Sequence, residues 1–473
     1  MSGLGCTLAL LGMAKADSYT GTAWSVRFNR PDQTTGYSSI GPEEFAIREA
    51  WVARLQSLQS GDWACLSTYT FSGASAATGA AGPILEAMSN ALARGVSLAF
   101  VADHGVDIQS NYWPGVSLAS LSQRPGNVLQ LSRSPQGGIM HDKMGVFWHA
   151  GSRQGWVLSG SWNFTTGASS QQWNILTELQ DNTLSAAYSN EFRELLSGRF
   201  HGNPHKSHAH DGTRFRMEGF WQDGWVRFAP YPDALSGGNN ALTDITNAIA
   251  GATNEIFFAL NKLTRRDVVD ELIRACDRGV AVHGVISKSD WLNPGADSHE
   301  MVKRMLERTN YATWNRIRLF PAYYDAAHTR YDNNNRDLVH TKYMILDPRS
   351  PRPMLIHGSA NWTASALVST NANDENVQFL PHAGMALAFL EHFAQMTDGM
   401  KPWCALRVED SGFRLWLDYW LPDVRLYAIG STTRLEEEGS WSSQTINLPK
   451  ARGTHTVELP VDGRKRFYRL QAQ

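Results

Sequence analysis

The chain has 473 residues, of which 42% are hydrophobic, so it is long enough for two or three domains with substantial cores. Its formal net charge is −2 without a long run of Lys or Arg, which argues against a generic nucleic-acid binder but leaves room for a local basic cleft. The four cysteines lie far apart without a zinc-ligand spacing, so a disulfide framework is not expected, while one isolated bridge stays open.

Residues 1–16 resemble a secretory signal peptide. An apolar run from Cys6 to Met13 precedes Ala14-Lys15-Ala16, which has the form of a cleavage site, although no basic residue precedes the run. A disordered or core-packed N-terminus is the alternative. No later run reaches the ~18 apolar residues of a membrane span. The sequence therefore predicts a soluble mature protein that is secreted or periplasmic.

The sequence repeats itself once, at a spacing of about 200 residues. The segment Trp24-Ser25-Val26-Arg27-Phe28 returns as Gly224-Trp225-Val226-Arg227-Phe228, and each copy precedes a helix, a strand, a second helix and a second strand. The expected helices contain 47–58, 84–92, 242–249 and 268–276, and the expected strands are 65–71, 97–101, 255–260 and 281–286. Alternating strands and helices predict an α/β fold with two homologous halves, each a largely parallel sheet flanked by helices.

The remaining segments complete the expected domain organisation. Four histidines crowd into 201–210 without a Cys or Glu among them, so a solvated linker is favoured over a metal site. Alternating patterns at 413–420, 424–429, 444–448, 454–459 and 467–470 predict a small β-sandwich-like module. The predicted parts are a signal peptide (1–16), a first half (17–203), a His-rich linker (204–224), a second half (225–402) and a β-rich C-terminal module (403–473).

Each half also carries the same polar motif. The second half has His340-Thr341-Lys342, with Asp347 after it and Gly358-Ser359-Ala360-Asn361 further on. The first half has His141-Asp142-Lys143 and then Gly160-Ser161-Trp162-Asn163. The His-to-Asn spacing is 21 residues in the second half and 22 in the first. Side chains alternate along a strand, so each His lies on the same face as its Lys.

This doubled set suits cleavage of a phosphodiester. Two Lys ammoniums and two Asn amides can bind the non-bridging oxygens, and they bind them more strongly in the transition state. One His can attack phosphorus to form a phosphohistidine, while the other protonates the leaving alcohol. The lysines supply the positive charge, so the pattern predicts a phosphodiesterase without a metal or other cofactor.

The pattern resembles the phospholipase D superfamily, whose repeated motif is His-x-Lys-x4-Asp followed by Gly-Ser-x-Asn. The resemblance covers about residues 24–400 and implies two halves around one active site. It departs from the family pattern at Trp148, which stands where the first motif should have its acid. The resemblance implies catalytic His141 and His340, phosphate-binding Lys143, Lys342, Asn163 and Asn361, and supporting Ser161, Ser359, Asp347 and Glu375.

The two histidines are expected to have separate roles. Glu375 is predicted to bind His340 and raise its pKa, which suits a general acid. The matching stretch 171–174 of the first half has no carboxylate, although Gln or Asn there can accept a His N–H. His141 should therefore be neutral and act as the nucleophile, in agreement with the family's usual assignment.

The substrate is left open between two kinds of phosphodiester. The near-neutral charge and the predicted export favour a monomeric phospholipase D that hydrolyses or transfers the phosphatidyl group of a glycerophospholipid at a membrane surface. A secreted nuclease and a non-catalytic phosphate- or lipid-binding protein are the alternatives. Aromatic residues near the motifs could line an acyl-chain site, stack on bases or fill the core: Trp148, Trp162, Phe164, Trp173 and Trp362.

Overall fold

The computed structural model describes two units, Met1–Phe393 and Ala394–Gln473. The described residues are 18–31, 42–75, 79–231, 239–287, 297–306, 309–310, 315–322, 338–368, 373–398, 403–408, 415–421, 427–432, 442–444, 453–459 and 467–472. The predicted signal peptide, 1–16, lies outside them.

The first unit contains two sheets with one shared strand order, as the duplicated sequence predicts. The first runs β2 (Trp24–Asn29), β8 (Gln172–Gln180), β7 (Gln154–Gly160), β6 (Met144–His149), β3 (Trp63–Thr68), β4 (Ser97–Ala102) and β5 (Val128–Arg133). The second runs β10 (Gly224–Ala229), β18 (Glu375–Leu380), β17 (Met354–Gly358), β16 (Lys342–Leu346), β11 (Glu255–Leu260), β12 (Ala281–Ser287) and β14 (Asn315–Ala322). Short strands add to the edges: β1 (Ser18–Thr20), β9 (Arg214–Phe215) and β13 (Thr309–Asn310).

The sheets are mixed, so the expectation of largely parallel sheets is wrong. Strands β3, β4 and β5 are parallel to one another, as are β11, β12 and β14. The neighbouring pairs β3–β6, β6–β7, β7–β8 and β2–β8 are antiparallel, with the same directions in the second sheet. Helical crossovers join the parallel strands, whereas short connections join β6 to β7 and β16 to β17. Only antiparallel neighbours can be joined by a short turn.

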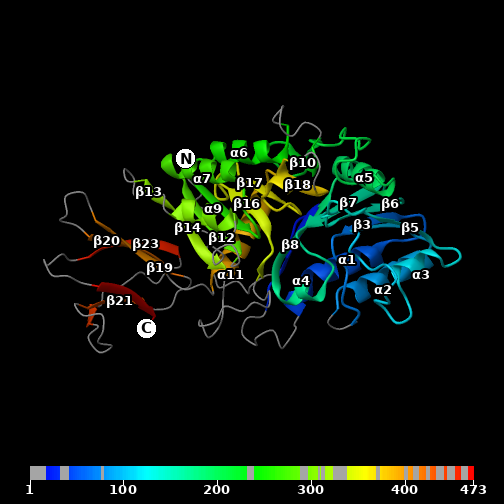
Figure 1. The fold of residues 1–473 in the computed structure, drawn as a ribbon, viewed down its shortest axis with the longest axis horizontal. Helices are drawn as coiled ribbons and strands as arrows, with labels where there is room; N and C mark the ends of the chain where they lie inside the picture. The colour runs from blue at the N-terminus through cyan, green and yellow to red at the C-terminus, as the bar shows by residue number, and fades with distance from the viewer. Residues whose placement is uncertain are drawn as a thin grey trace, which may run out of the picture. The chain divides into compact units, whose positions relative to one another are not determined.

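Helices cover both faces of each sheet. In the first half, α1 (Ala46–Ser57), α2 (Ala81–Ala93) and α3 (Leu118–Ser122) pack on one face and α5 (Asn182–Leu196) on the other (Figure 1). In the second half, α6 (Ala241–Gly251), α7 (Arg266–Asp277) and α9 (Asp297–Leu306) share one core cluster, and α11 (Ala383–Asp398) packs its Phe389 and Phe393 against Tyr343 and Phe257. Gly95 and Gly279 directly follow the C-caps of α2 and α7, with φ angles of +85° and +97° that suit the end of a helix.

Most of the aromatic residues beside the motifs fill the core. Trp162 and Phe164 belong to the first-half cluster and Trp362 to the second, with exposed fractions of 2%, 0% and 1%. Trp173 is also buried. These four side chains therefore cannot form a wall for acyl chains or a stacking surface for bases.

The histidine-rich segment between the halves is not a solvated linker, which corrects the sequence-based expectation. His201, Lys206 and His210 are all buried, and their side chains lie beside buried carboxylates. The sequence pattern could not show this because the acidic partners lie elsewhere in the chain.

After the end of α11, the described residues of the second unit lie in strands. Two three-stranded antiparallel sheets are present: β19 (Trp403–Val408), β20 (Leu415–Leu421) and β23 (Gly453–Leu459), and β22 (Ser442–Gln444), β21 (Tyr427–Thr432) and β24 (Phe467–Ala472). Within the described part of the chain, no helix has both the length and the apolar character to cross a membrane.

Candidate active site

Each motif histidine leaves its own half and lies beside the other half's sheet. Strand β15 (Leu338–Val339) pairs in parallel with β8, and the next residue, His340, donates its backbone N–H to Trp173 O at 3.0 Å. In the same way, His141 donates its backbone N–H to Asp374 O at 3.0 Å, just before β18. The two contacts are equivalent and bring both histidines to the seam between the halves.

Because each histidine lies beside the other half, its imidazole also has its partner there. His141 Nδ1 lies 2.7 Å from Glu375 Oε1, and His340 Nδ1 lies 2.9 Å from Asn174 Oδ1. The prediction that Glu375 binds His340 is therefore wrong. It assumed that each half orients its own histidine, whereas the strand pairing gives each histidine a partner from the other half.

The motif serines hold these partners in place. Ser359 Oγ donates to Glu375 Oε2 at 2.6 Å, and Ser161 Oγ donates to Asn174 Oδ1 at 2.8 Å. Each serine also accepts a backbone N–H from the residue after that partner, at 3.0 Å in both halves. The Gly-Ser-x-Asn motif of one half thus fixes the side chain that orients the other half's histidine.

The two motif lysines form one positively charged site. Lys143 and Lys342 are each 1% exposed, and each Nζ donates to the backbone oxygen of its own motif histidine at 2.6 Å. Burial lowers the pKa of Lys143 to about 8, and burial together with the charge of Lys143 lowers the pKa of Lys342 well below its usual value. The two cations are thus close enough to repel each other, which favours binding of an anion between them.

The histidines respond to the same surroundings. Burial lowers the pKa of His141 to about 4, although Glu375 acts to raise it. Burial lowers the pKa of His340 well below its usual value, and the charges of Lys342 and Lys143 lower it further. Burial opposes ionisation of Glu375, but His141 and Lys143 bring its pKa below the usual value. Burial thus disfavours the charged form of both imidazoles, whereas the groups around Glu375 favour its ionised form.

The motif asparagines complete the polar set. The Oδ1 atoms of Asn163 and Asn361 are buried and have no hydrogen-bond partner among the described residues. A buried polar atom without a partner costs about 1–3 kcal/mol, so these amides have the character of a site prepared for a ligand. No group of three or more His, Cys, Asp or Glu side chains in the described ranges has the arrangement to hold a metal ion.

These features agree with the comparisons with known proteins. A family model described as "Cardiolipin synthase, PLD-like domain" matches residues 60–196 and 245–397, more than half of the chain. The chain belongs to this family. Its phospholipase D-like phosphodiesterase or transferase domain confirms the resemblance that the doubled motif predicts.

Several solved structures are similar to this chain at low sequence identity. Phosphatidylserine synthase from Haemophilus influenzae Rd KW20 matches with a TM-score of 0.53 and 12% identity, over 76% of this chain and 85% of that one. Polyphosphate kinase from Porphyromonas gingivalis gives 0.47 and 14%, over 80% of this chain and 50% of that one. Nuc from Salmonella typhimurium, a phospholipase D family member, gives 0.28 and 23%, over 38% and 97%. This chain thus spans half the length of the polyphosphate kinase, and no curated protein matches it significantly.

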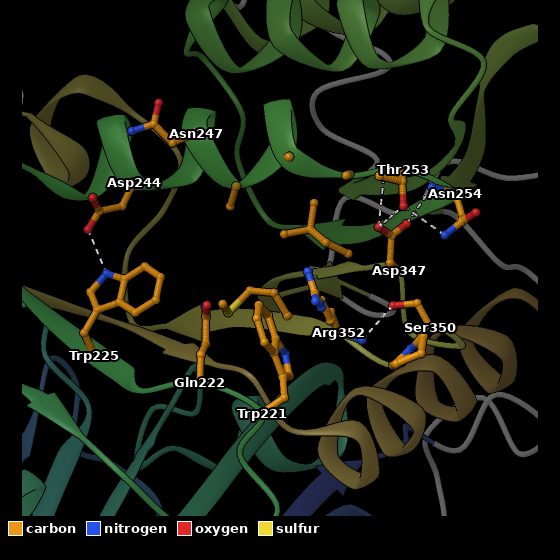
Figure 2. A pocket seen from close by; sticks show the side chains of 16 residues that line it. Trp221, Gln222, Trp225, Asp244, Asn247, Thr253, Asn254, Asp347, Ser350 and Arg352 are labelled. Atoms are coloured by element: carbon orange, nitrogen blue, oxygen red, sulfur yellow. Dashed lines mark hydrogen bonds between the residues drawn. The ribbon is translucent and has the colours of Figure 1, made fainter.

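The acid of the second phospholipase D-like motif lies away from the histidines. Asp347 follows β16, at the opposite end of that strand from Lys342. Its carboxylate accepts backbone N–H groups of Thr253, Asn254 and Glu255 at 2.7–2.9 Å. Asp347 therefore fixes the turn into β11. Figure 2 shows it among the residues that line a surface pocket of about 720 Å³ at this end of the strand, so that pocket is separate from the histidines.

The first half solves the same structural problem with a different residue. Trp148, which stands at the position of Asp347, pairs across the strands with Trp63, and their rings stack with centroids 6.3 Å apart. Asp62 precedes Trp63 and accepts the backbone N–H groups of Gln59 and Ala150, both at 2.9 Å. In the first half the acid that accepts these backbone N–H groups thus lies just before β3 and not after β6. Trp148 therefore does not replace a side chain that contacts the motif histidines.

Tyr69 is a site residue that the sequence reading missed. Its ring centroid lies 5.0 Å from that of His141 in an edge-to-face contact, and Lys143 Nζ lies 5.3 Å from the same centroid. Tyr69 directly follows β3, and its position at the end of a buried strand of the parallel segment was the available signal.

Proposed function

We propose that this protein is a metal-independent phosphodiesterase that acts through a phosphohistidine intermediate. The observation that carries the proposal is the meeting of two His-Lys pairs at one seam, where each imidazole has its Nδ1 held by a residue of the other half. Lys143 and Lys342 supply the positive charge for the non-bridging oxygens, and Asn163 and Asn361 supply amide groups.

In this proposal His141 is the nucleophile. In this proposal the Nδ1–H of His141 donates a hydrogen bond to Glu375, so the Nε2 lone pair is available for attack on phosphorus. A bond forms between Nε2 and phosphorus while the bond from phosphorus to the leaving oxygen breaks. The phosphorylated imidazole then carries a positive charge, which the Glu375 carboxylate offsets. In this proposal the carboxylate therefore assists the nucleophile. The sequence analysis expected it to assist the general acid instead.

His340 is the general acid and then the general base. Its Nδ1 faces the neutral Asn174, which orients the ring without adding a negative charge that would retain the proton. When the anionic substrate offsets the two lysines, His340 can take up a proton and then donate it from Nε2 to the leaving alkoxide. In the second step His340 removes a proton from water or an alcohol, which attacks phosphorus and releases His141.

The proposed substrate is a glycerophospholipid, whose phosphatidyl group is hydrolysed or transferred. The description of the matched family names a cardiolipin synthase, and the near-neutral net charge favours a lipid over a polyanionic nucleic acid. The aromatic residues beside the motifs that are buried in the core do not favour either substrate. A nucleic-acid phosphodiester is the alternative outcome of the test.

The purified chain, tested on phosphatidylcholine vesicles and on single-stranded DNA in parallel, separates these substrates. We expect head-group release that survives EDTA, changes little between low and moderate salt, and disappears in His141→Ala. A nuclease that contacts several phosphates should weaken steeply with salt. Cleavage of DNA without head-group release would assign the protein to the nucleases, and loss of turnover in EDTA with recovery in zinc or calcium would contradict the mechanism.

A further inference from the structure

The residue before Glu375 is the centre of a buried charge network. Asp374 is 0% exposed, and its Oδ1 accepts hydrogen bonds from Lys206 Nζ at 2.8 Å and from the backbone N–H of His201 at 2.9 Å. His201 Nδ1 lies 3.0 Å from the other carboxylate oxygen. Both partners belong to the segment that joins the halves.

Lys206 connects this carboxylate to the first half. Its Nζ lies 2.6 Å from Oε1 of Glu191 on α5, whose other oxygen lies 2.7 Å from His210 Nε2. Burial opposes the charge on Lys206, but Asp374 and Glu191 raise its pKa above the usual value. One buried ammonium thus joins α5 to the start of β18.

The backbone of Asp374 also contacts the segment that carries the nucleophile. Its N–H donates to Ile139 O at 3.0 Å, and its carbonyl accepts the N–H of His141 at 3.0 Å. Asp374 is therefore connected to both members of the pair, to Glu375 by the peptide bond and to His141 by its carbonyl. At the equivalent position beside His340 the chain has Trp173, which has no carboxylate to bind an ammonium.

We propose that the segment 201–206 holds the catalytic pair of Glu375 and His141 in register, with Lys206 as its positioning residue. This inference rests on the proposed function of His141. Without the ammonium, Asp374 and Glu191 become buried carboxylates that lack their shared cation. Asp142, also fully buried, lies close enough that both raise its pKa, so the region already concentrates negative charge. Asp374 then relaxes away from Glu191 and alters the Glu375–His141 contact.

The test compares Lys206→Met with Arg227→Met. Arg227 is the matched control because it is also a buried cation between two carboxylates, Asp211 at 3.0 Å and Asp244 at 2.7 Å, and it does not contact Asp374. Both variants should lower Tm. We expect Lys206→Met to reduce kcat per folded molecule by about 10²-fold, as for a displaced catalytic contact, with a smaller change in KM, whereas Arg227→Met should keep the wild-type kcat.

A spectroscopic measurement separates this inference from the proposed function. The Nδ1 proton of His141, shared with Glu375, should give a downfield proton resonance that is identified by its loss in His141→Gln. It should disappear or move upfield in Lys206→Met and persist in Arg227→Met. A wild-type chain without diesterase activity would contradict the proposed function but leave this measurement decisive. An unchanged resonance and an unchanged kcat in Lys206→Met would overturn the inference.

His201→Asn serves if Lys206→Met fails to fold. Asparagine tolerates the positive φ of 54° at this position, and the variant keeps Lys206 while it removes the imidazole beside Asp374. We expect the same resonance to shift and kcat to fall by a smaller factor. A wild-type resonance and kcat in a folded His201→Asn variant would overturn the inference.

Discussion

The two halves share one strand order and one motif, yet their histidines have different environments. His141 lies beside the carboxylate of Glu375, whereas His340 lies beside the neutral amide of Asn174. The strand pairing that causes this exchange is the same in both halves, so the asymmetry comes from single side chains on a symmetric framework. The comparison teaches that the duplicated fold places each histidine and its partner in equivalent positions. Whether that partner is a carboxylate or an amide then makes the two histidines chemically different.

The largest expected effect is the loss of each histidine in turn. His141→Ala should abolish turnover and the acid-labile phosphoenzyme with every substrate. His340→Ala should lose about 10²–10⁴-fold on a natural alcohol leaving group, the usual worth of general acid catalysis. It should keep much of its burst on a p-nitrophenyl diester, whose leaving group needs no proton. Rapid-quench measurements decide, and a burst that survives only in His141→Ala would reverse the assignment.

Substitution of Glu375 and Asn174, the hydrogen-bond partners of the two histidines, should have the next largest effect. Glu375→Gln keeps an acceptor for His141 but removes the charge, and loss of a charge-assisted hydrogen bond of about 1.5–3 kcal/mol corresponds to about 10- to 100-fold in the rate of phosphoenzyme formation. Asn174→Asp should cost less and should raise the pKa of His340, because a nearby carboxylate favours the cation. Single-turnover rates over a pH series measure both. A greater loss in Asn174→Asp would contradict the proposed roles.

Anion binding should take up protons at the lysine pair. In the free site the pKa of Lys143 is lowered to about 8, and a bound anion raises it, so the bound state holds more protons than the free state. Affinity for sulfate, which does not titrate in this range, should therefore fall as pH rises from 7 to 9, by up to about tenfold per pH unit for each proton. Calorimetry in two buffers measures the uptake. Lys143→Met provides the control, and unchanged uptake in that variant would exclude Lys143 as its source.

The smallest effects should come from the two capping acids. Asp347→Asn and Asp62→Asn each weaken a carboxylate that accepts several backbone N–H groups, and each should lower the free energy of unfolding by about 1–3 kcal/mol. Neither carboxylate contacts the histidine partners, so kcat per folded molecule should stay at the wild-type value. Thermal unfolding and initial rates measure the two quantities. A catalytic defect in Asp347→Asn alone would show that the motif acid acts on the site.

Local sequence patterns predicted much of the framework. The helices at 47–58 and 84–92 and their counterparts at 242–249 and 268–276 appear as α1, α2, α6 and α7, because an apolar stripe at helical spacing must face a core. Strand β11 has the predicted bounds, 255–260. The sheet direction was predicted less well, because an apolar strand pattern does not state which neighbour pairs with it or in which direction.

The sequence by itself identified the candidate reacting groups, because His141 and Lys143, like His340 and Lys342, lie two positions apart and their relation is local. Only the tertiary structure decided that Glu375 serves His141, that Asp62 replaces the missing motif acid, and that Lys206 is buried between two carboxylates. Each of these contacts joins residues that are far apart in sequence. Periodicity records which face of an element is buried, whereas a partner on another element depends on how the two halves pack together.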